Sequence, residues 1–386
     1  MSDSLHNIVI AGDLFPASGN LKMFISGDSE TLFGERVCEL FKNADFSIVN
    51  LEGALTDSKS KQDKVPPIIS ASPQSICAIK NLIGKGVLSL ANNHVTDYGD
   101  EGVSDTIAAI NNAGLRYLGA GLSETEIQHS TCVDIAGRKV GIYVVSEIFF
   151  NQPGKQKAGV HTYDEYIVCK EISELKKSTD YVIVIYHGGA ERFPYPTPLV
   201  RKRFHRMAEC GADFIAAQHT HCIGCAEWYK GSYLLYGQGN FLFSRMTQPY
   251  ARQGLVTEII FNSEVSIKQH WVKVLDDETL CYDNESGLAD FERRNNEILQ
   301  EGQVDRSYQK YIKDNTKLKF DYLSAFRGET IDKTLLMRFS PRLYKERLWK
   351  KYKKDQLLRI LLSLQSDRTR ENVLNMWLQL FEQYKS

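Results

Sequence analysis

The chain has 386 residues, of which 42% are hydrophobic and 25% are charged, and its formal net charge is −1. This composition is typical of a globular protein with a sizeable core, and the near-neutral charge predicts no nucleic-acid partner. The first residues show no signal-peptide pattern, and no apolar run reaches the ~20 residues that span a bilayer. The eight cysteines are scattered rather than arranged as a disulfide framework, so we expect a cytoplasmic protein.

Strand and helix patterns alternate through the first two thirds of the chain. In chain order they predict a strand at 7–15, a helix at 29–44 opened by Ser29, a strand at 46–53, a helix at 72–84, a strand at 86–94, a helix at 99–114, a hairpin at 131–147, a helix at 164–180, a strand at 181–189, a helix at 197–210, a strand at 212–221, and hairpins at 225–241 and 254–274. Strand–helix–strand order indicates parallel crossovers, so we expect an α/β fold with an antiparallel portion.

The C-terminal part has a different pattern. After about residue 278 strand patterns stop, and we divide the chain into a domain at 1–280 and a helical C-terminal region at 281–386. Within that region, residues 338–359 carry nine basic and two acidic residues. The preferred interpretation is a solvated amphipathic helix. The alternative is peripheral contact with an acidic membrane surface, an anionic polymer or a biosynthetic complex.

Polar residues gather where the predicted parallel strands end. These residues are Asp13; Asn50 and Glu52; Asn92, Asn93 and His94; His187; and His219 and His221. Because the carboxyl ends of parallel strands open onto one edge of the sheet, we expect the side chains to converge. Carboxylates, an amide and imidazoles together suit divalent transition metals. A bridging carboxylate can hold two ions about 3.5–4 Å apart, as in phosphoryl hydrolysis.

Each of these residues alone has a simpler explanation. A single Asp or Glu after a strand usually caps a helix or forms a turn, and an isolated His is usually surface or core. The pair His219 and His221 is a stronger signal, because alternate residues of a strand share a face. Cys222 and Cys225 follow directly, and we interpret them as local thiols rather than as a zinc site. The joint occurrence at five strand ends favours a metal centre.

Several motifs together resemble one protein family. They are "GD" at 12–13, "VNLEGALT" at 49–56, "LANNHVTDYG" at 90–99, "YHGGAE" at 186–191, "QHTH" at 218–221 and "YGQGNFLFS" at 236–244. In this order they resemble the bacterial capsule-synthesis proteins of the CapA or PGA_cap type, some of which are linked to poly-γ-glutamate production. The resemblance covers roughly residues 7–260. It implies a four-layered αββα fold related to the calcineurin-like metallophosphoesterases.

The resemblance also implies roles for the residues at the strand ends. It implies two divalent ions (Mn, Zn or Fe), with Glu52 as the bridging carboxylate between them. The implied ligands are Asp13 and His221 for the first ion, and Asn93, His187 and His219 for the second.

Catalytic and supporting roles follow from the same resemblance. His94 would act as the acid that protonates a leaving oxygen, and Glu191 is placed with it among the catalytic residues. Asn50, Asn92 and Asn240 are expected to contact substrate or to support the ligands, with Asn92 holding the turn.

Competing functions remain open at this point. The favoured one is a metal-dependent hydrolase in capsule, poly-γ-glutamate or surface-polysaccharide biosynthesis, acting on a phosphoester or amide bond of an anionic small molecule or polymer. The alternative is a non-catalytic binding or assembly protein that keeps the fold. Phe15 supports that alternative, because the superfamily's first motif has His at this position. The superfamily's second motif has Asp where this chain has Glu52, and the capsule-synthesis family shows both changes. A nucleotide-binding enzyme is disfavoured, since no G-x-G-x-x-G follows the first strand.

Overall fold

The structure is a computed structural model that describes residues 6–64, 67–149, 151–243, 248–283 and 286–315. The chain divides into two compact units, Met1–Tyr308 and Gln309–Ser386. The basic segment 338–359 and its predicted contacts lie outside the described residues, as does most of the helical C-terminal region predicted at 281–386. Among the helices that the structure describes, none combines the length and apolar character needed to cross a membrane.

The first sheet of the N-terminal unit has a parallel centre and an antiparallel flank. Its strands run in the order β18 (Leu280–Asp283), β17 (Val265–Val274), β16 (Gln253–Phe261), β1 (Asn7–Phe15), β2 (Phe46–Leu51), β5 (Gly86–Ser89) and β6 (Arg116–Leu118). Strands β1, β2, β5 and β6 are parallel, whereas β16, β17 and β18 are antiparallel. β15 (Asn240–Phe243) also pairs with the end of β1, in parallel.

The second sheet is built in the same way. Its order is β13 (Ala226–Tyr229), β14 (Ser232–Leu235), β12 (Phe214–Gln218), β11 (Tyr181–His187), β9 (Arg138–Ser146) and β8 (Ser130–Ile135). The four central strands are parallel and the two outer ones antiparallel. Two short pairs complete the strands: β3 (Ala54–Leu55) with β4 (Ser70–Ala71), and β7 (Ala120–Gly121) with β10 (Gly159–Val160).

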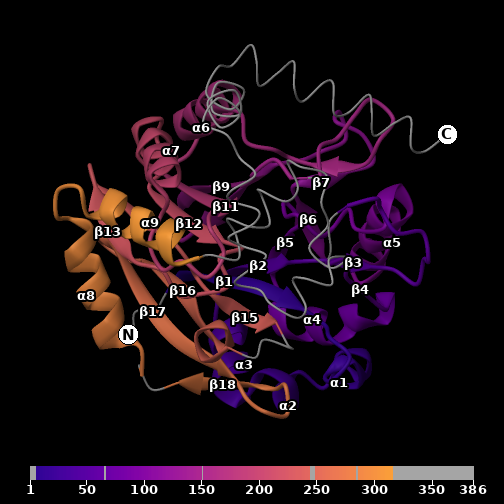
Figure 1. Cartoon of the computed structure of the whole chain (residues 1–386). Coiled ribbons are helices and arrows are strands. Elements are labelled where there is room, and N and C mark those ends of the chain that lie inside the picture. The colour runs from indigo at the N-terminus through magenta and orange to yellow at the C-terminus, as the bar shows by residue number, and fades with distance from the viewer. Residues whose placement is uncertain (1–5, 65–66, 150, 244–247, 284–285, 316–386) are drawn as a thin grey trace, which may run out of the picture. The chain divides into compact units, whose positions relative to one another are not determined.

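Helices cover the outer faces of the two sheets, and this gives the four-layered αββα arrangement (Figure 1). The first sheet is covered by α1 (Leu21–Ser26), α2 (Ser29–Phe33), α3 (Glu35–Lys42), α4 (Ile76–Ile83) and α5 (Gly99–Asn112). The second is covered by α6 (Glu165–Lys177) and α7 (Pro198–Glu209). Short 3-10 turns lie at η1 (Pro73–Ser75) and η2 (Pro249–Arg252), and α8 (Leu288–Ile298) and α9 (Gln303–Asp314) follow the last strand. The predicted fold class is confirmed.

Alternation along the central strands explains why the sheets stack. In β1, Ile8 and Ile10 enter the core between the two sheets, while Val9 and Ala11 enter the core beneath the helices. Every residue of β1 is buried, as expected for a parallel strand covered on both faces. At ~25 cal/mol per Å² of apolar surface, this double burial is the main force that holds the layers together. The polar ends of the same strands are therefore carried into the interior.

Two local features differ from the sequence-based expectation. The helix predicted at 29–44 is two helices, because Gly34 adopts a φ of 78° and breaks it. Asp28, rather than Ser29, caps the first of them by accepting a hydrogen bond from the N–H of Thr31.

The end of the second sheet also differs. The segment 225–241 begins as the predicted hairpin of β13 and β14, but Asn240 starts a strand of the first sheet. Gly12 permits this approach, since a Cβ there would lie 2.6 Å from the carbonyl oxygen of Gly239. The expectation that strands end near residue 278 is wrong, because β18 pairs with β17 beyond it.

Glu227, a buried carboxylate on β13, allows the stability of the second sheet to be tested. The Glu227 side chain, 3% exposed, accepts hydrogen bonds from Arg201 at 2.7 and 3.0 Å, His205 at 2.8 Å and Tyr236 at 2.7 Å. Burial alone would raise the pKa of Glu227, but these hydrogen bonds outweigh it and lower the pKa to about 2.

The stabilisation from Glu227 is therefore present above the unfolded pKa near 4.5 and is lost as the pH falls towards 2. We expect Glu227→Gln to lower the free energy of unfolding at pH 7 by on the order of 3 kcal/mol and to flatten its acid dependence. Urea unfolding between pH 7 and pH 2.5 measures both, with the exposed Glu264→Gln as control. An unchanged acid dependence in Glu227→Gln would contradict the prediction.

Candidate metal centre

Polar side chains from both sheets meet in one interior cluster. They come from the end of β1 (Asp13), from β2 and the residue after it (Asn50, Glu52), from the turn after β5 (Asn92, Asn93, His94), from the end of β11 (His187), from the turn after β12 (His219, His221) and from the start of β15 (Asn240). All are buried except Asn93, which is half-buried. The structure thus brings together the residues that the sequence placed at strand ends.

Asp13, Glu52 and His221 form the first group with the spacing of metal ligands. One ligand atom of each lies within 4.8 Å of the others. The Nδ1 of His221 is 3.6 Å from Oδ2 of Asp13 and 2.8 Å from Oδ1 of Asn240. Burial acts to lower the pKa of His221, but the carboxylates of Glu52 and Asp13 raise the pKa above its usual value. The contact with Oδ1 of Asn240 fixes the orientation of the His221 ring, a candidate ligand.

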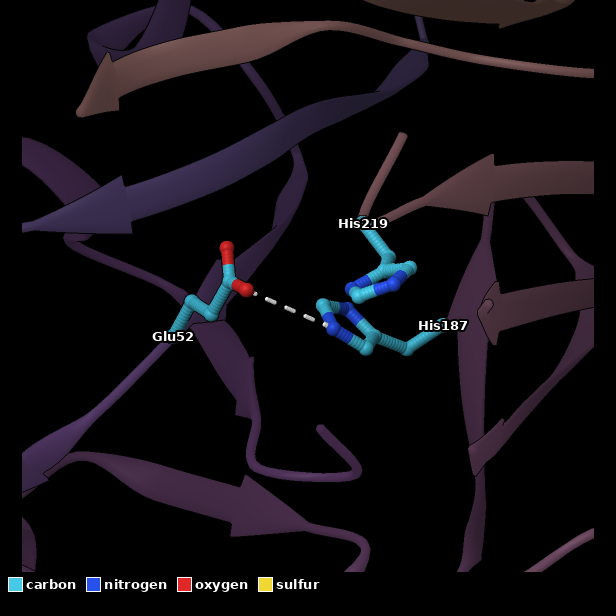
Figure 2. A group of neighbouring side chains, drawn as sticks. All are labelled: Glu52, His187 and His219. Atoms are coloured by element: carbon cyan, nitrogen blue, oxygen red, sulfur yellow. Dashed lines mark ion pairs between the residues drawn. The ribbon is translucent and has the colours of Figure 1, made fainter. Parts of the chain in front are cut away.

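Glu52, His187 and His219 form the second group. Figure 2 shows the Glu52 carboxylate pointing toward the His187 imidazole, with the His219 ring beside it. The Nε2 of His187 lies 3.5 Å from Oε1 of Glu52, and the centroids of the two rings are 5.0 Å apart. Burial lowers the pKa of His187 to about 3 and lowers that of His219 well below its usual value. Both imidazoles are therefore neutral, which is the form that binds metal.

Glu52 belongs to both groups, and its environment fits a bound cation. Within the described residues, neither of its carboxylate oxygens has a hydrogen-bond partner, and the same holds for Nδ1 of His219. Burial, followed by the nearby Asp13 carboxylate, raises the pKa of Glu52 to about 8. An unpartnered buried polar atom costs ~1–3 kcal/mol, and more when it is charged. A dication between Asp13 and Glu52 would satisfy these atoms and offset the repulsion.

Two asparagines support the candidate ligands. Asn50 donates to Oδ1 of Asp13 at 2.8 Å and lies 3.3 Å from Nδ1 of His187. Asn92 accepts the N–H groups of His94 and Val95 at 3.0 and 2.9 Å, so it closes the turn. It also donates to Oδ1 of Asn50 at 3.2 Å. These amides set the positions of the candidate ligands.

The remaining asparagine of the turn faces the second group directly. Oδ1 of Asn93 lies 2.8 Å from Nε2 of His187. The amide oxygen is therefore within reach of an ion bound at His187.

His94 stands beside the ligand groups and is oriented by two residues that the sequence analysis did not single out. Its Nδ1 lies 2.8 Å from Oδ2 of Asp97, a fully buried carboxylate that also pairs with Lys64. Lys64 donates in addition to the backbone oxygen of Asn93 at 2.7 Å. A carboxylate at Nδ1 leaves Nε2 of His94 as the nitrogen that can exchange a proton. The His-x-x-Asp spacing of His94 and Asp97 is the sequence signal that indicates this pair.

The backbone delivers His219 and His221 in an unexpected way. The strand predicted at 212–221 ends at Gln218, and both histidines have positive φ angles, 84° and 52°. Such angles are uncommon for non-glycine residues and cost of order 1–3 kcal/mol each. Alternation along a strand is therefore not what aims the two side chains inward. The N–H of His219 donates to Oδ2 of Asp13 at 3.0 Å and ties this turn to β1.

Two further sets of residues lie at or near the cluster. Glu191 is at the exposed rim, with its Oε1 4.0 Å from Nε2 of His219. Cys222 and Cys225 are buried, and burial raises the pKa of both thiols. A raised pKa disfavours the thiolate that binds zinc, in agreement with their interpretation as local thiols.

The fold and the cluster define a class: a four-layered αββα protein whose strand ends present two carboxylate–histidine groups that share Glu52. Residues 7–245 match the family described as bacterial capsule synthesis protein PGA_cap, and the chain belongs to that family. The resemblance expected from the motifs is confirmed.

Two curated relatives show how far the similarity extends. The capsule biosynthesis protein CapA of Bacillus anthracis is 32% identical over 218 residues, which cover 54% of this chain and 53% of that protein. The PGA biosynthesis protein CapA of Bacillus subtilis (strain 168) is 29% identical over 252 residues, covering 63% and 65%. The chain therefore matches between about half and two thirds of the length of these relatives. Among solved structures, the NAD nucleotidase of Haemophilus influenzae is similar over 81% of this chain and 68% of that chain, with 12% identity and a TM-score of 0.43.

Proposed function

We propose that this chain is a metal-dependent hydrolase that serves capsule or poly-γ-glutamate biosynthesis. Its family and the names of its relatives support the pathway. The observation that carries the chemistry is Glu52, a buried carboxylate shared by two ligand groups and without a hydrogen-bond partner among the described residues. The substrate is an anionic small molecule or polymer with a phosphoester or amide bond. All eight cysteines lie among the described residues as free thiols, which supports a cytoplasmic location.

The proposed ligand sets follow the two groups. Asp13, Glu52 and His221 hold one divalent ion; Glu52, His187 and His219, assisted by Asn93, hold the other. Mn, Zn or Fe suit these nitrogen and oxygen ligands, and such ions polarise a phosphoryl or acyl oxygen and provide a nucleophile from water at neutral pH.

The protein's own groups would position and protonate the substrate. His94 presents Nε2 to the leaving oxygen as a general acid, while Asp97 holds its Nδ1 and so selects the tautomer. Lys64 neutralises Asp97 and also donates to the backbone oxygen of Asn93. These contacts fix the position of the acid His94 relative to the candidate ligand Asn93. Glu191, at the rim, is placed to contact the part of the substrate that extends into solvent.

The purified full chain tests this proposal. Metal content is measured first, and turnover of a generic aryl phosphodiester and of a γ-glutamyl oligomer is then measured with added Mn²⁺ or Zn²⁺. We expect up to two ions bound at the centre around Glu52 and metal-dependent cleavage of one substrate. A folded protein with neither bound metal nor turnover would contradict the hydrolase.

A non-catalytic binding or assembly protein is the second candidate, and one observation favours it. Phe15 occupies the position of the first-motif His, and its ring packs against Phe243 at a centroid distance of 5.7 Å. That position offers an apolar ring instead of a ligand. Bound metal without cleavage of either substrate would support this second candidate.

A further inference from the structure

A second cluster of potential ligands lies apart from the candidate metal centre. His129 precedes β8, His161 follows β10, Glu171 lies on α6 and Tyr143 on β9. Tyr143 belongs to the core between the second sheet and its helices, so the cluster sits on the outer side of that sheet. It shares no residue with the groups around Glu52.

The geometry of this cluster matches a three-ligand metal site. The rings of His129 and His161 stack with centroids 4.3 Å apart and planes inclined by 19°. Nε2 of His129 lies 3.4 Å from Oε1 of Glu171, and Nε2 of His161 lies 3.3 Å from Oε2. Ligands ~2.0–2.2 Å from a tetrahedral ion stand roughly 3.4 Å from one another. The two nitrogens face different oxygens of the same carboxylate, and one ligand atom of each residue lies within 4.8 Å of the others, so side-chain rotation would bring the three onto one ion.

The protonation states also suit a metal. Burial, followed by the neighbouring His161, lowers the pKa of His129, so its imidazole is neutral at pH 7. Burial acts to raise the pKa of Glu171, but hydrogen bonds from His161 and Tyr143 outweigh it and lower the pKa, so the carboxylate is ionised. Two imidazoles and one carboxylate are a common zinc ligand set.

Tyr143 completes the arrangement as a supporting residue. Its hydroxyl donates to Oε2 of Glu171 at 2.7 Å and lies 2.6 Å from Nε2 of His161. Burial raises the pKa of this phenol well above its usual value, so Tyr143 stays protonated and orients Glu171 instead of binding the ion.

We propose that His129, His161 and Glu171 form a mononuclear site for a divalent transition metal, with Zn²⁺ as the preferred ion and Tyr143 as a positioning residue. Imidazole ligands favour Zn²⁺ over Mg²⁺ or Ca²⁺. The side chains of His129 and Glu171 are each 28% exposed, which leaves the ion access from solvent and a fourth position for water. The ion would join the start of β8, the segment after β10 and α6.

This junction has a structural consequence. The chain between β9 and α6 contains Phe149, whose ring centroid is 5.0 Å from that of His219, and Asn151, which donates to the backbone oxygen of Asn92 at 3.1 Å. An ion at His161 would anchor the far end of the chain segment that borders the first centre.

Cobalt titration of the full chain tests the site, because tetrahedral Co²⁺ absorbs far more strongly in the visible range than octahedral Co²⁺. We expect His129→Gln and Glu171→Gln each to lose one equivalent of bound Co²⁺, and Tyr143→Phe to weaken Zn²⁺ binding by about 10- to 100-fold. His6→Gln is the control, since His6 is a partly exposed histidine that lies near a carboxylate, Asp45 at 3.1 Å, but in none of the three ligand groups. Equal stoichiometry and spectra in all variants would overturn the proposal.

A measurement on the unaltered chain keeps the test independent of variant folding. Zn²⁺ is expected to slow the modification of His129 and His161 by diethylpyrocarbonate about tenfold or more, as followed by peptide mass mapping, because coordination occupies the reacting nitrogen. Unchanged rates at both histidines would refute the site. Mapping by residue separates this result from metal binding at the first centre, so the two proposals fail independently.

Discussion

Glu52→Gln is expected to abolish metal binding at the first centre and, at the same time, to make the metal-free protein more stable. Glu52 is the residue that both ligand groups share, so its loss impairs the two together. Without metal, however, its carboxylate is buried and has no hydrogen-bond partner within the described residues. Burial and the nearby Asp13 carboxylate raise the pKa of Glu52 to about 8. The same side chain therefore destabilises the metal-free state and stabilises the metal-bound state.

The sign of the pH dependence follows from the raised pKa. In the metal-free protein, the stabilisation linked to Glu52 is complete below the unfolded pKa near 4.5 and is lost as the pH rises through about 8. At pH 7 the native state holds Glu52 mostly protonated, and taking up that proton on folding costs on the order of 3 kcal/mol, which the neutral amide of Gln avoids. Saturating metal makes the unaltered protein more stable than Glu52→Gln. A metal concentration 100-fold above Kd stabilises the native state of the unaltered protein by ~2.7 kcal/mol per ion.

Urea unfolding at pH 7, in chelator and in saturating Mn²⁺ or Zn²⁺, measures this crossover. The control is Glu191→Gln at the exposed rim, which should follow the unaltered protein in both conditions. The proposed role of Glu52 is wrong if Glu52→Gln is less stable than the unaltered protein in chelator. It is also wrong if metal raises the free energy of unfolding of the variant as much as that of the unaltered protein.

His94→Asn is expected to reduce turnover by about 10²- to 10⁴-fold while leaving the metal content unchanged. The reason is geometric: His94 is in neither ligand group, and its Nδ1 is held by Asp97. His221→Asn, by contrast, should lose metal and turnover together. Steady-state kinetics combined with metal analysis of the same preparations distinguishes the two outcomes.

Asp97→Asn separates positioning from protonation at His94. The change should lower kcat, because a neutral amide no longer fixes the tautomer and orientation of the His94 imidazole. His270→Asn is a suitable control, since His270 is also a buried histidine paired with a carboxylate, Glu258, at 2.8 Å. Full turnover in His94→Asn with metal bound would assign the proton donor elsewhere.

Local periodicity accounts for the elements that sequence predicts best. The strand Asn7–Phe15, the helices Glu165–Lys177 and Pro198–Glu209, and the hairpin of β8 and β9 match their predicted positions closely. In each, the apolar pattern is continuous and the ends carry strong capping or turn residues, such as Thr197 before α7. The break at Gly34 was missed because the apolar period continues across it, while the backbone turns at one glycine.

The membership of the candidate centre was also accessible from residue order. Parallel strands place their carboxyl ends at one edge of a sheet, so the sequence predicts that Asp13, Glu52, His187 and the two histidines after β12 converge. The partners of His94 were not accessible in this way. Lys64 lies 33 residues from Asp97 in a segment without regular structure, and only the folded chain brings the two together.

Residue order alone therefore predicts the alternation of strands and helices and the set of polar side chains at the strand ends, because these depend on local patterns. The four-layered arrangement is implied by the family motifs. Tertiary structure decides the rest. Glu52 is shared by two ligand groups and has no hydrogen-bond partner among the described residues, and His219 and His221 turn inward through left-handed backbone. In the same way, only the folded chain brings His129, His161 and Glu171 together at α6. These features depend on contacts between segments that are distant in the sequence. Such contacts form only when the two complete sheets pack, and they leave no periodic signal in the chain.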